Sequence, residues 1–187
     1  MSNSIKLSEI ADIIAGVKPG LKTLRNNVKF IKNANLLDLI TIDTENALGG
    51  YFTREKTAKF KKSKILKNDI LISLQGKIGI VSIAIKNLDC FPGSSMAIIR
   101  PKKIKPEYLL CVLNSKKFQL QLKKFSSGTV LPVVSLKSLG DIEIPLMSDS
   151  EQLKVVKKFN DLKNNILNTE LELNKYKKYL ENFDIND

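Results

Sequence analysis

The hydrophobic positions of this chain are most regular in its last quarter, from Ser148 to Phe183. Apolar and aromatic residues recur there with a seven-residue period, which is typical of a helix that packs along one seam. Ser148 or Ser150 can cap the first turn, and the carboxylates of Asp149 and Glu151 favour the positive end of a helix. The pattern predicts a helix roughly 50 Å long. Its a and d positions are Phe159, Leu162, Ile166, Thr169, Leu173, Tyr176, Leu180 and Phe183.

Two arrangements can bury this seam. The helix can fold back along its own domain, or it can pair with a helix of another chain. A strict seven-residue period favours pairing, and so do charged residues that flank the seam and can form ion pairs across a dimer. These flanking residues are Lys163, Glu170, Glu172 and Lys177. We therefore expect residues 149–187 to form a long coiled-coil helix that joins two copies of the chain.

The earlier part of the chain carries shorter patterns, which predict both helices and strands. The segment from Lys6 to Gly16 is expected to form a short amphipathic helix, with Ser8 as its N-cap and Gly16 at its end. A second helix is expected from Pro106 to about Gln121, because proline suits the first turn of a helix. The predicted strands are residues 28–31, 36–42, 70–74, 80–85, 96–100 and 141–146. Residues 36–42 fit a helix as well.

The connections between these elements are also predicted. Residues 70–85 form a β-hairpin with a glycine-containing connection, and residues 130–134 are an apolar run broken by Pro132. Residues 46–64 show no clean period, so we expect a loop with one short strand. The fold class that follows is α+β: one mixed domain with a twisted β-sheet over residues 1–148, followed by the long C-terminal helix.

Charge divides the chain in the same place. Residues 1–150 contain 24 Lys and Arg against 12 Asp and Glu, whereas residues 151–187 contain 7 of each. All of the net charge therefore belongs to the domain, which suggests a polyanion-binding domain on a neutral arm. A Lys- and Asn-rich proteome is the alternative explanation, and charge alone does not separate DNA from RNA or anionic lipid.

Several kinds of chemistry are not expected. The chain has no His, and its carboxylates are scattered, so we expect no catalytic residues, no metal site and no cofactor. Cys90 and Cys111 are expected to be small core residues. No apolar run has the length of a membrane span, and the N-terminal residues do not resemble a signal peptide. We therefore expect a cytoplasmic protein without a membrane partner.

Basic residues are concentrated in two segments before residue 65. The first is the segment from Val17 to Asn27, and the second is the irregular stretch from Arg54 to Lys64, beside Tyr51, Phe52 and Thr53. Such a composition suits a nucleic-acid-reading loop as well as a solvated basic surface, because cations hold phosphates and polar groups meet base edges. The phosphate candidates are Lys18, Lys22, Arg25, Lys56, Lys59, Lys61, Lys62 and Lys64.

An ordered set of segments resembles the DNA-specificity subunit of type I restriction-modification systems. The set begins at Lys6–Gly16 and continues through the residues of the predicted hairpin and the helix that follows it. The matching segments are Leu66–Ser73, Gly76, Gly79–Val81, Tyr108–Leu110, Ser127–Thr129, Leu139–Leu146 and Glu151–Gln152. The usual subunit of that family carries two target-recognition domains and two long helical regions, which act as spacers and dock methyltransferase subunits. This chain has one of each.

The resemblance implies a non-catalytic half-subunit. Residues 1–148 would be a target-recognition domain that binds double-stranded DNA in the major groove, and residues 149–187 a dimerisation and spacer arm. Two copies would read two inverted half-sites, and the homodimer would recruit methyltransferase (M) subunits and possibly a restriction (R) subunit. Residues able to donate and accept hydrogen bonds are the base-edge candidates. They are Thr53, Arg54, Gln75, Lys77, Ser126, Ser127 and Thr129.

Two other functions stay open. The chain can be an orphan module that binds a methyltransferase or a full specificity subunit and modulates it without reading DNA. It can also bind RNA, although an aromatic content of 6% argues against a single-strand reader, because such proteins rely on stacking.

Overall fold

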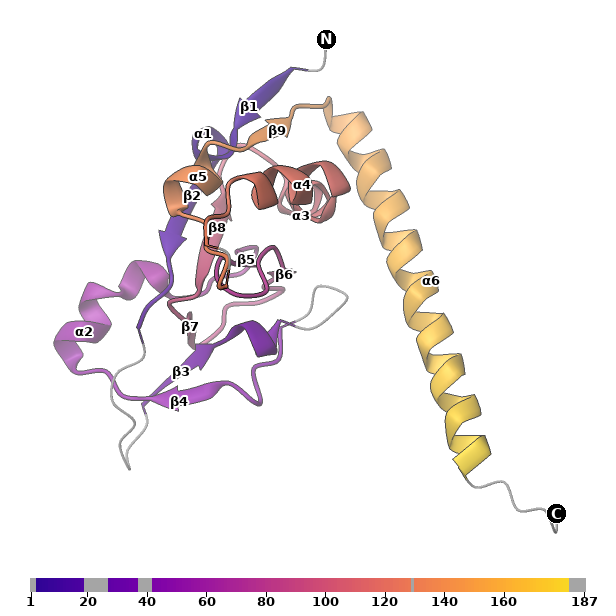
Figure 1. The fold of residues 1–187 in the computed structure, drawn as a ribbon, viewed down its shortest axis with the longest axis horizontal. Helices are drawn as coiled ribbons and strands as arrows, with labels where there is room; N and C mark the ends of the chain where they lie inside the picture. The colour runs from indigo at the N-terminus through magenta and orange to yellow at the C-terminus, as the bar shows by residue number, and fades with distance from the viewer. Residues whose placement is uncertain (1–2, 19–26, 37–41, 129, 182–187) are drawn as a thin grey trace.

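The computed structural model describes residues 3–18, 27–36, 42–128 and 130–181 (Figure 1). Its main sheet has the strand order β2–β8–β5–β6, and every neighbouring pair is antiparallel. These strands are β2 (Ala11–Ala15), β8 (Met96–Pro101), β5 (Ile70–Ser73) and β6 (Val81–Ile83). The predicted hairpin is therefore confirmed as β5 and β6, and the predicted strand from residue 96 is confirmed as β8.

Two smaller sheets flank the main one among the described residues. β1 (Ser4–Lys6) pairs antiparallel with β9 (Glu143–Pro145), which lies within the strand expected at residues 141–146. β3 (Val28–Ile31) lies between β4 (Leu48–Gly50) and β7 (Cys90–Pro92), antiparallel to the first and parallel to the second. Leu36 and Ile42 form an isolated bridge, and residues 37–41 of the strand predicted there lie outside the described residues.

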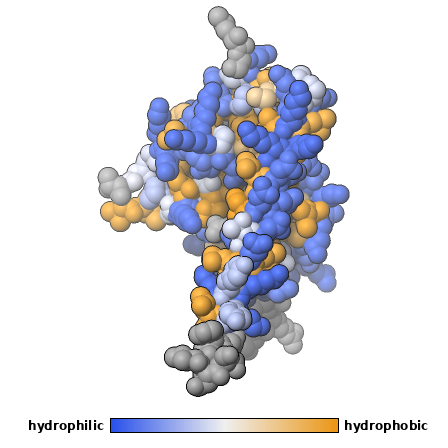
Figure 2. Space-filling view, turned by 90° about the vertical axis from the view of Figure 1, so that its right-hand side faces the viewer, coloured by the Kyte–Doolittle hydropathy of each residue, from blue (hydrophilic) through white to orange (hydrophobic). Residues whose placement is uncertain are grey.

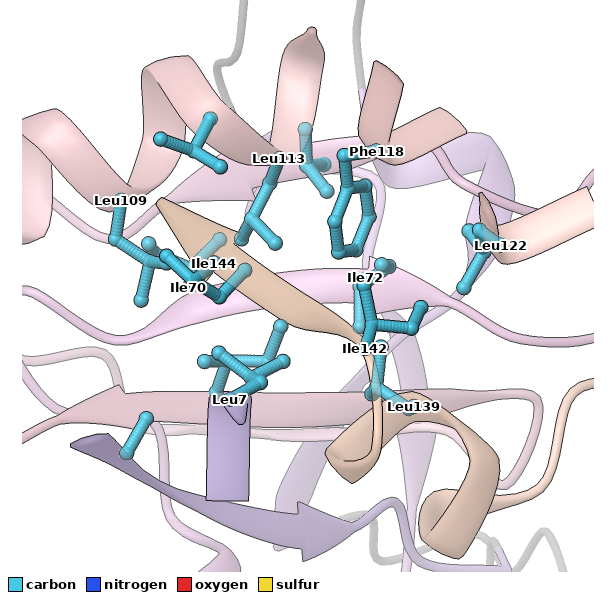
Figure 3. Close-up of a cluster of buried hydrophobic side chains, with 14 of the residues drawn as sticks. Leu7, Ile70, Ile72, Leu109, Leu113, Phe118, Leu122, Leu139, Ile142 and Ile144 are labelled. Atoms are coloured by element: carbon cyan, nitrogen blue, oxygen red, sulfur yellow. The ribbon is translucent and has the colours of Figure 1, made fainter. Parts of the chain in front are cut away.

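Helices cover one face of the main sheet and enclose the larger core (Figure 3). The side chains of Ile70 and Ile72 point toward Leu113 and Phe118, while Leu71 points to the opposite face and packs in a second core. Residues 70–74 are all buried because both faces of β5 are covered, which is why the segment is apolar except for Ser73. The hydroxyl of Ser73 donates a hydrogen bond to the carbonyl of Lys77 (2.7 Å) and accepts one from the amide of Ile80 (2.9 Å). The covering helices are α3 (Pro106–Asn114), α4 (Lys116–Lys124), α1 (Leu7–Ile10) and α5 (Leu136–Gly140).

The segment from Lys6 to Gly16 differs from the prediction of one helix. Only four residues are helical, Ser8 lies within the helix and not at its N-cap, and residues 11–15 form β2. Apolar residues at this spacing fit both the period of a helix and the period of a strand. The hydrogen bonds with β8 favour the strand. Gly16 does not end a helix. Its role is steric, because a Cβ atom there would lie 1.9 Å from the carbonyl oxygen of Gly93.

The helix expected from Pro106 to Gln121 is broken in two at Ser115. This residue has an extended backbone, and its hydroxyl accepts a hydrogen bond from the amide of Phe118 (3.3 Å), so it is the N-cap of α4. Serine favours helix ends because its side chain competes with the backbone for hydrogen bonds. The break turns α4 so that Phe118 and Leu122 both reach the core.

The long C-terminal helix is confirmed as α6 (Asp149–Glu181). Ser148 is its N-cap. The Ser148 amide donates a hydrogen bond to the Glu151 carboxylate (2.9 Å), and the Glu151 amide donates one to the Ser148 hydroxyl (3.4 Å). The hydrogen bond with Ser148 lowers the pKa of Glu151. The buried Tyr108 of α3 secures the junction, because its hydroxyl donates to the carbonyl of Pro145 (2.9 Å).

Only the first turns of α6 pack on the domain. Val155, Val156 and Phe159 contact the larger core, and Gln152 is buried. Beyond them the helix extends past the domain, and apolar residues appear along it between hydrophilic ones (Figures 1 and 2). The seam side chains from Leu162 to Leu180 that are apolar or aromatic are 49–70% exposed. Folding back therefore buries only the start of the seam. Phe183 lies outside the described residues.

Candidate nucleic-acid interface

Residues 46–64 contain the short strand that we expected, as β4, but the rest is not a loop. It contains the helix α2 (Arg54–Lys59) and a 3₁₀ turn (Lys61–Ser63). Thr53 is the N-cap of α2, since its hydroxyl accepts a hydrogen bond from the amide of Lys56 (3.2 Å). The helix is shorter than the window in which a hydrophobic period can be read, so the cap was the one signal in the sequence.

Aromatic residues at both ends of α2 hold it against the small sheet. Phe52 precedes the helix and Phe60 follows it, and their ring centroids lie 5.5 Å apart. Phe52 also contacts Phe30 and Phe91 of the sheet, at 5.2 and 5.3 Å. Asn27 completes the attachment: its amide group donates to the carbonyl of Phe52 (2.8 Å) and accepts from the amide of Phe52 (2.9 Å).

This attachment leaves the basic side chains of α2 and the following turn in solvent. Glu55 is the one acidic residue between positions 54 and 62. We call this group the α2 surface; it consists of Arg54, Lys56, Lys59, Lys61 and Lys62, all of which are exposed. Figure 1 shows α2 and α6 on opposite sides of the domain. The α2 surface is therefore well placed to meet a polyanion without contacting the arm.

A pocket opens beside the α2 surface. It has a volume of about 530 Å³, and Arg54 and Lys61 line it together with Lys64 and Asn27. Lys64 differs from the other basic residues because its ammonium group forms an ion pair with Asp89 (2.7 Å), which offsets part of its charge. The pocket thus gathers three cationic side chains, and the ion pair with Asp89 makes Lys64 less available to a ligand than Arg54 and Lys61.

A second group of predicted residues meets at the β5–β6 connection, residues 75–79. The described residues of the loop after α4, 126–128 and 130–134, lie directly against it, and we call these two segments together the loop surface. Two backbone hydrogen bonds join the loop to the hairpin: Gly76 N to Pro132 O (3.0 Å) and Val134 N to Leu74 O (2.9 Å). Two more close the loop on itself: Ser127 N to Val133 O (3.0 Å) and Val133 N to Ser127 O (2.9 Å). Gln75, Lys77, Ser126 and Ser127 are therefore brought together by the fold.

Asn33 ties the loop surface to the small sheet. Its amide group donates to the carbonyl of Gln75 (2.9 Å), and the hydroxyl of Ser95 donates to its side-chain oxygen (3.2 Å). Ser126 has a structural partner as well, because its hydroxyl donates to the carbonyl of Lys123 at the end of α4 (2.7 Å). The position of this surface is thus set by several segments at once, and Ser126 is less available to a ligand than Ser127.

The loop surface contains a feature that the sequence analysis missed. The apolar residues Val130, Leu131 and Val133 are exposed, although an apolar run is usually buried. Gly128 and Pro132, which punctuate the run, are the available signal that it forms a turn. The charged residues of the surface and of the end of α4 are all basic: Lys77, Lys123 and Lys124.

The predicted site residues therefore fall into two groups. Thr53 and Arg54 lie at α2, next to the start of β3, whereas the other described base-edge candidates lie at the loop surface, next to the end of β3. Lys18 is exposed after β2. Three candidates lie outside the described residues: Lys22, Arg25 and Thr129.

A comparison of the sequence with protein families identifies one family. The profile of the type I restriction modification DNA specificity domain matches residues 2–176. The chain belongs to this family. The match begins before β1 and extends into the exposed part of α6, so the specificity domain includes both the basic domain and much of the arm.

Two characterised relatives agree with this assignment. The chain is 31% identical to the specificity subunit of the type I restriction enzyme EcoBI of Escherichia coli over 59% of its length. It is 28% identical to the MjaIX specificity subunit of Methanocaldococcus jannaschii over 84% of its length. The aligned parts make up 24% and 37% of those subunits, so the chain spans well under half of each relative. Both are specificity subunits, which agrees with the prediction of a non-catalytic member.

The fold of this specificity-family chain also matches a solved structure. A chain of a type I R-M system superposes with a TM-score of 0.70 at 22% identity, and the match covers 96% of this chain and 42% of the other. The predicted α+β class with a long C-terminal helix is therefore confirmed.

Two further observations concern the described part of the chain. It contains no group of three or more His, Cys, Asp or Glu side chains arranged to hold a metal ion. None of its helices combines the length and the hydrophobicity needed to cross a membrane.

Proposed function

We propose that the chain is a DNA-recognition half-subunit of a type I restriction-modification system, and that two copies joined through α6 read a bipartite site and recruit methyltransferase subunits. The observation that carries the proposal is the arrangement of the basic α2 surface and the polar loop surface with Lys77 at the two ends of β3, in a chain whose family is defined by DNA specificity. The boundary between reading domain and arm is proposed near residue 148, where α6 begins.

The spacing of the two surfaces suits a short half-site. Asn27 holds the α2 segment and Asn33 holds the loop surface, and six residue steps of chain separate them. An extended chain of six residues spans at most about 22 Å. At 3.4 Å per base step, this length corresponds to about six base pairs. Both surfaces can therefore contact the same half-site.

The two surfaces would have different roles. The α2 surface presents ammonium and guanidinium groups on a helix held rigidly by aromatic contacts, which suits phosphate binding. The loop surface presents Gln75, Lys77 and Ser127, which can donate and accept hydrogen bonds at base edges. Arg54 lies at the edge of the α2 surface and can serve either role, because guanidinium groups bind phosphates and guanine alike.

The arm supports the proposal of a dimer. Its seam continues for several turns beyond the domain, and its apolar side chains lie about half exposed or more. Pairing with an identical seam would bury them, and an antiparallel pair would place the two reading domains at opposite ends of a rod. Such a dimer would bind two inverted half-sites at a fixed separation.

Selection of binding sequences from random duplex DNA tests the proposal. The expected result is two inverted copies of one short motif with a fixed spacer between them, and insertion of one heptad into the exposed part of α6 should lengthen that spacer. A single uninterrupted motif would contradict the dimer. A chain that binds a methyltransferase subunit but no duplex would support the orphan module, and a preference for RNA would contradict DNA recognition.

The salt dependence of binding tests the α2 surface. The triple substitution of Lys56, Lys59 and Lys62 by Ala should weaken DNA binding. It should also make the slope of the logarithm of the association constant against the logarithm of salt concentration less steep by about 3, because each lost phosphate contact reduces the steepness by about 0.9. The matched control is the substitution of three exposed lysines of α6 by Ala: Lys154, Lys157 and Lys158. This control should leave the slope unchanged, and equal effects of the two triples would contradict the assignment.

A further inference from the structure

The loop surface has an apolar tip that its own fold leaves uncovered. Val130 is 96% exposed and Leu131 is 50% exposed, although neither lies at a chain end. Their exposure is not a consequence of a loose loop. The reciprocal hydrogen bonds between Ser127 and Val133 close the turn below them, and Gly76 fixes it to the hairpin connection. The two side chains are therefore held out in a defined position.

The tip lies among groups that can read DNA. A Cβ atom on Gly76 would lie 3.7 Å from the Cδ1 atom of Leu131, so Leu131 packs over the connection that carries Gln75 and Lys77. The apolar tip and the connection that carries Gln75 therefore belong to one surface. A tip in this position meets the same ligand as its polar neighbours.

The surrounding charge favours a polyanion over a protein partner as that ligand. No Asp or Glu occurs between Glu107 and Asp141, a stretch that includes α4 and the whole loop 126–134. Lys77 of the connection and the exposed Lys123 and Lys124 at the end of α4 are the charged neighbours. An apolar tip whose own segment and adjoining connection carry basic residues and no acidic ones is complementary to a duplex, whose backbone is anionic and whose base edges carry an apolar group only at thymine.

We propose that Val130 and Leu131 determine specificity by packing against the 5-methyl group of thymine in the major groove, while Gln75 and Lys77 bind neighbouring base edges. This inference rests on the proposed function, since it names residues that read the half-site. Thymine is the base that offers a methyl group there, and apolar side chains are its usual partners. The tip would thus distinguish A·T from G·C pairs at one or two positions.

Replacement of thymine by deoxyuridine provides the test, because it removes the methyl group and keeps the hydrogen-bonding groups. In the selected half-site, deoxyuridine at one thymine position should weaken binding of the unaltered protein by about fourfold, as expected for one methyl-sized group. The variants Val130→Ser and Leu131→Ser should bind the thymine duplex more weakly. At least one of them should lose the difference between the two duplexes, with the salt slope unchanged.

The control is Ile85→Ser, which removes an apolar side chain that is 79% exposed after β6. It should keep the full response to deoxyuridine. The inference is overturned if deoxyuridine has no effect at any position, if both tip variants respond to it as the unaltered protein does, or if the half-site contains no A·T pair. A tip that wedges between base steps would give the first of these results. If the unaltered protein shows no sequence-specific binding to any duplex, the proposed function is overturned, and this inference with it.

Discussion

Arg100 and Asp69 form a two-point ion pair beneath the α2 surface. The Nε and Nη2 atoms of the guanidinium donate to the two carboxylate oxygens, each at 2.7 Å, and Asp69 is only 1% exposed. The hydrogen bonds to Asp69 raise the pKa of Arg100. The same guanidinium donates to the carbonyls of Lys62 (3.4 Å) and Lys64 (3.0 Å). The pair therefore joins β8 to the basic segment that follows α2.

Removing either partner of this pair should destabilise the domain. Arg100→Ala should lower the free energy of unfolding by about 3–5 kcal/mol, because the Asp69 carboxylate is left buried without its charge partner. Asp69→Ala should lower it by less, because the Arg100 side chain is 24% exposed and keeps its bonds to two carbonyls. The double variant should lose less than the sum, since no unpaired charge remains. Urea unfolding of the four proteins measures the coupling. Strictly additive losses would show that the two side chains do not depend on each other.

The hydroxyl of Thr53 is expected to act mainly as a helix cap. Thr53→Ala should lower the stability of the domain by about 1 kcal/mol, because the amide of Lys56 loses its partner. Thr53→Ser keeps the hydroxyl and should restore most of the stability. Thermal unfolding measures both variants. If Thr53→Ala has full stability but weaker DNA binding, the hydroxyl is a base contact and not a cap.

The two glycines of the hairpin connection should differ in their tolerance of a side chain. Both have positive φ angles, 73° at Gly76 and 83° at Gly79. A Cβ atom at Gly79 would also lie 2.3 Å from the Oε1 atom of Gln119, whose amide group is held by the carbonyls of Gly79 and Leu113.

Gly79→Ala should therefore lower the free energy of unfolding by about 1–3 kcal/mol more than Gly76→Ala does. The Ala side chain at position 76 has the same backbone strain but meets open space apart from Leu131. Denaturant unfolding of the two variants gives the difference. Equal costs would mean that Gln119 moves aside without loss.

The two cysteines are expected to be unreactive in the folded protein. Both are buried, and burial raises the pKa of Cys90 and raises that of Cys111 to about 11. At pH 8 the reactive thiolate is therefore scarce and shielded from solvent. A thiol-specific reagent should modify neither residue in buffer and both in denaturant. Rapid modification of the native protein would contradict the packing of α3 or β7.

Substitutions along α6 should separate dimerisation from folding. Ile166→Asp or Leu173→Asp should convert a dimer to a monomer in sedimentation while the domain keeps its stability, because these side chains are exposed in the single chain. Phe159→Asp is the comparison: it packs on the core of the domain, so this variant should also lower the stability. A chain that sediments as a monomer without any substitution would contradict the proposed dimer.

Predictions from the sequence succeeded where one period continued for long enough to exclude the others. The long helix from residue 149 and the hairpin around Gly76 and Gly79 are examples. They failed where a short pattern fitted two structures: residues 11–15 fit a helix in isolation, and only β8 makes them a strand. The six-residue helix α2 falls below the length at which a period can be recognised.

The site shows the same division. The basic character of residues 54–62 and the polar character of Gln75 and Ser127 are properties of the amino acids themselves. That Gln75 and Ser127 share a surface follows from bonds between the hairpin and the loop after α4, which are about 50 residues apart. The exposure of Val130 was not predictable, because hydrophobicity alone indicates burial.

The sequence by itself determined that the net positive charge lies before residue 151 and that a long helix of zero net charge follows, since charge and heptad period are local properties of the chain. Only the tertiary structure decided which basic residues are free, which hydroxyls cap helices, and which apolar side chains face solvent. These depend on partners far away in the sequence, such as Asp69 for Arg100 and Asn33 for Gln75. Burial and hydrogen bonding are properties of the packed chain, and no local pattern contains them.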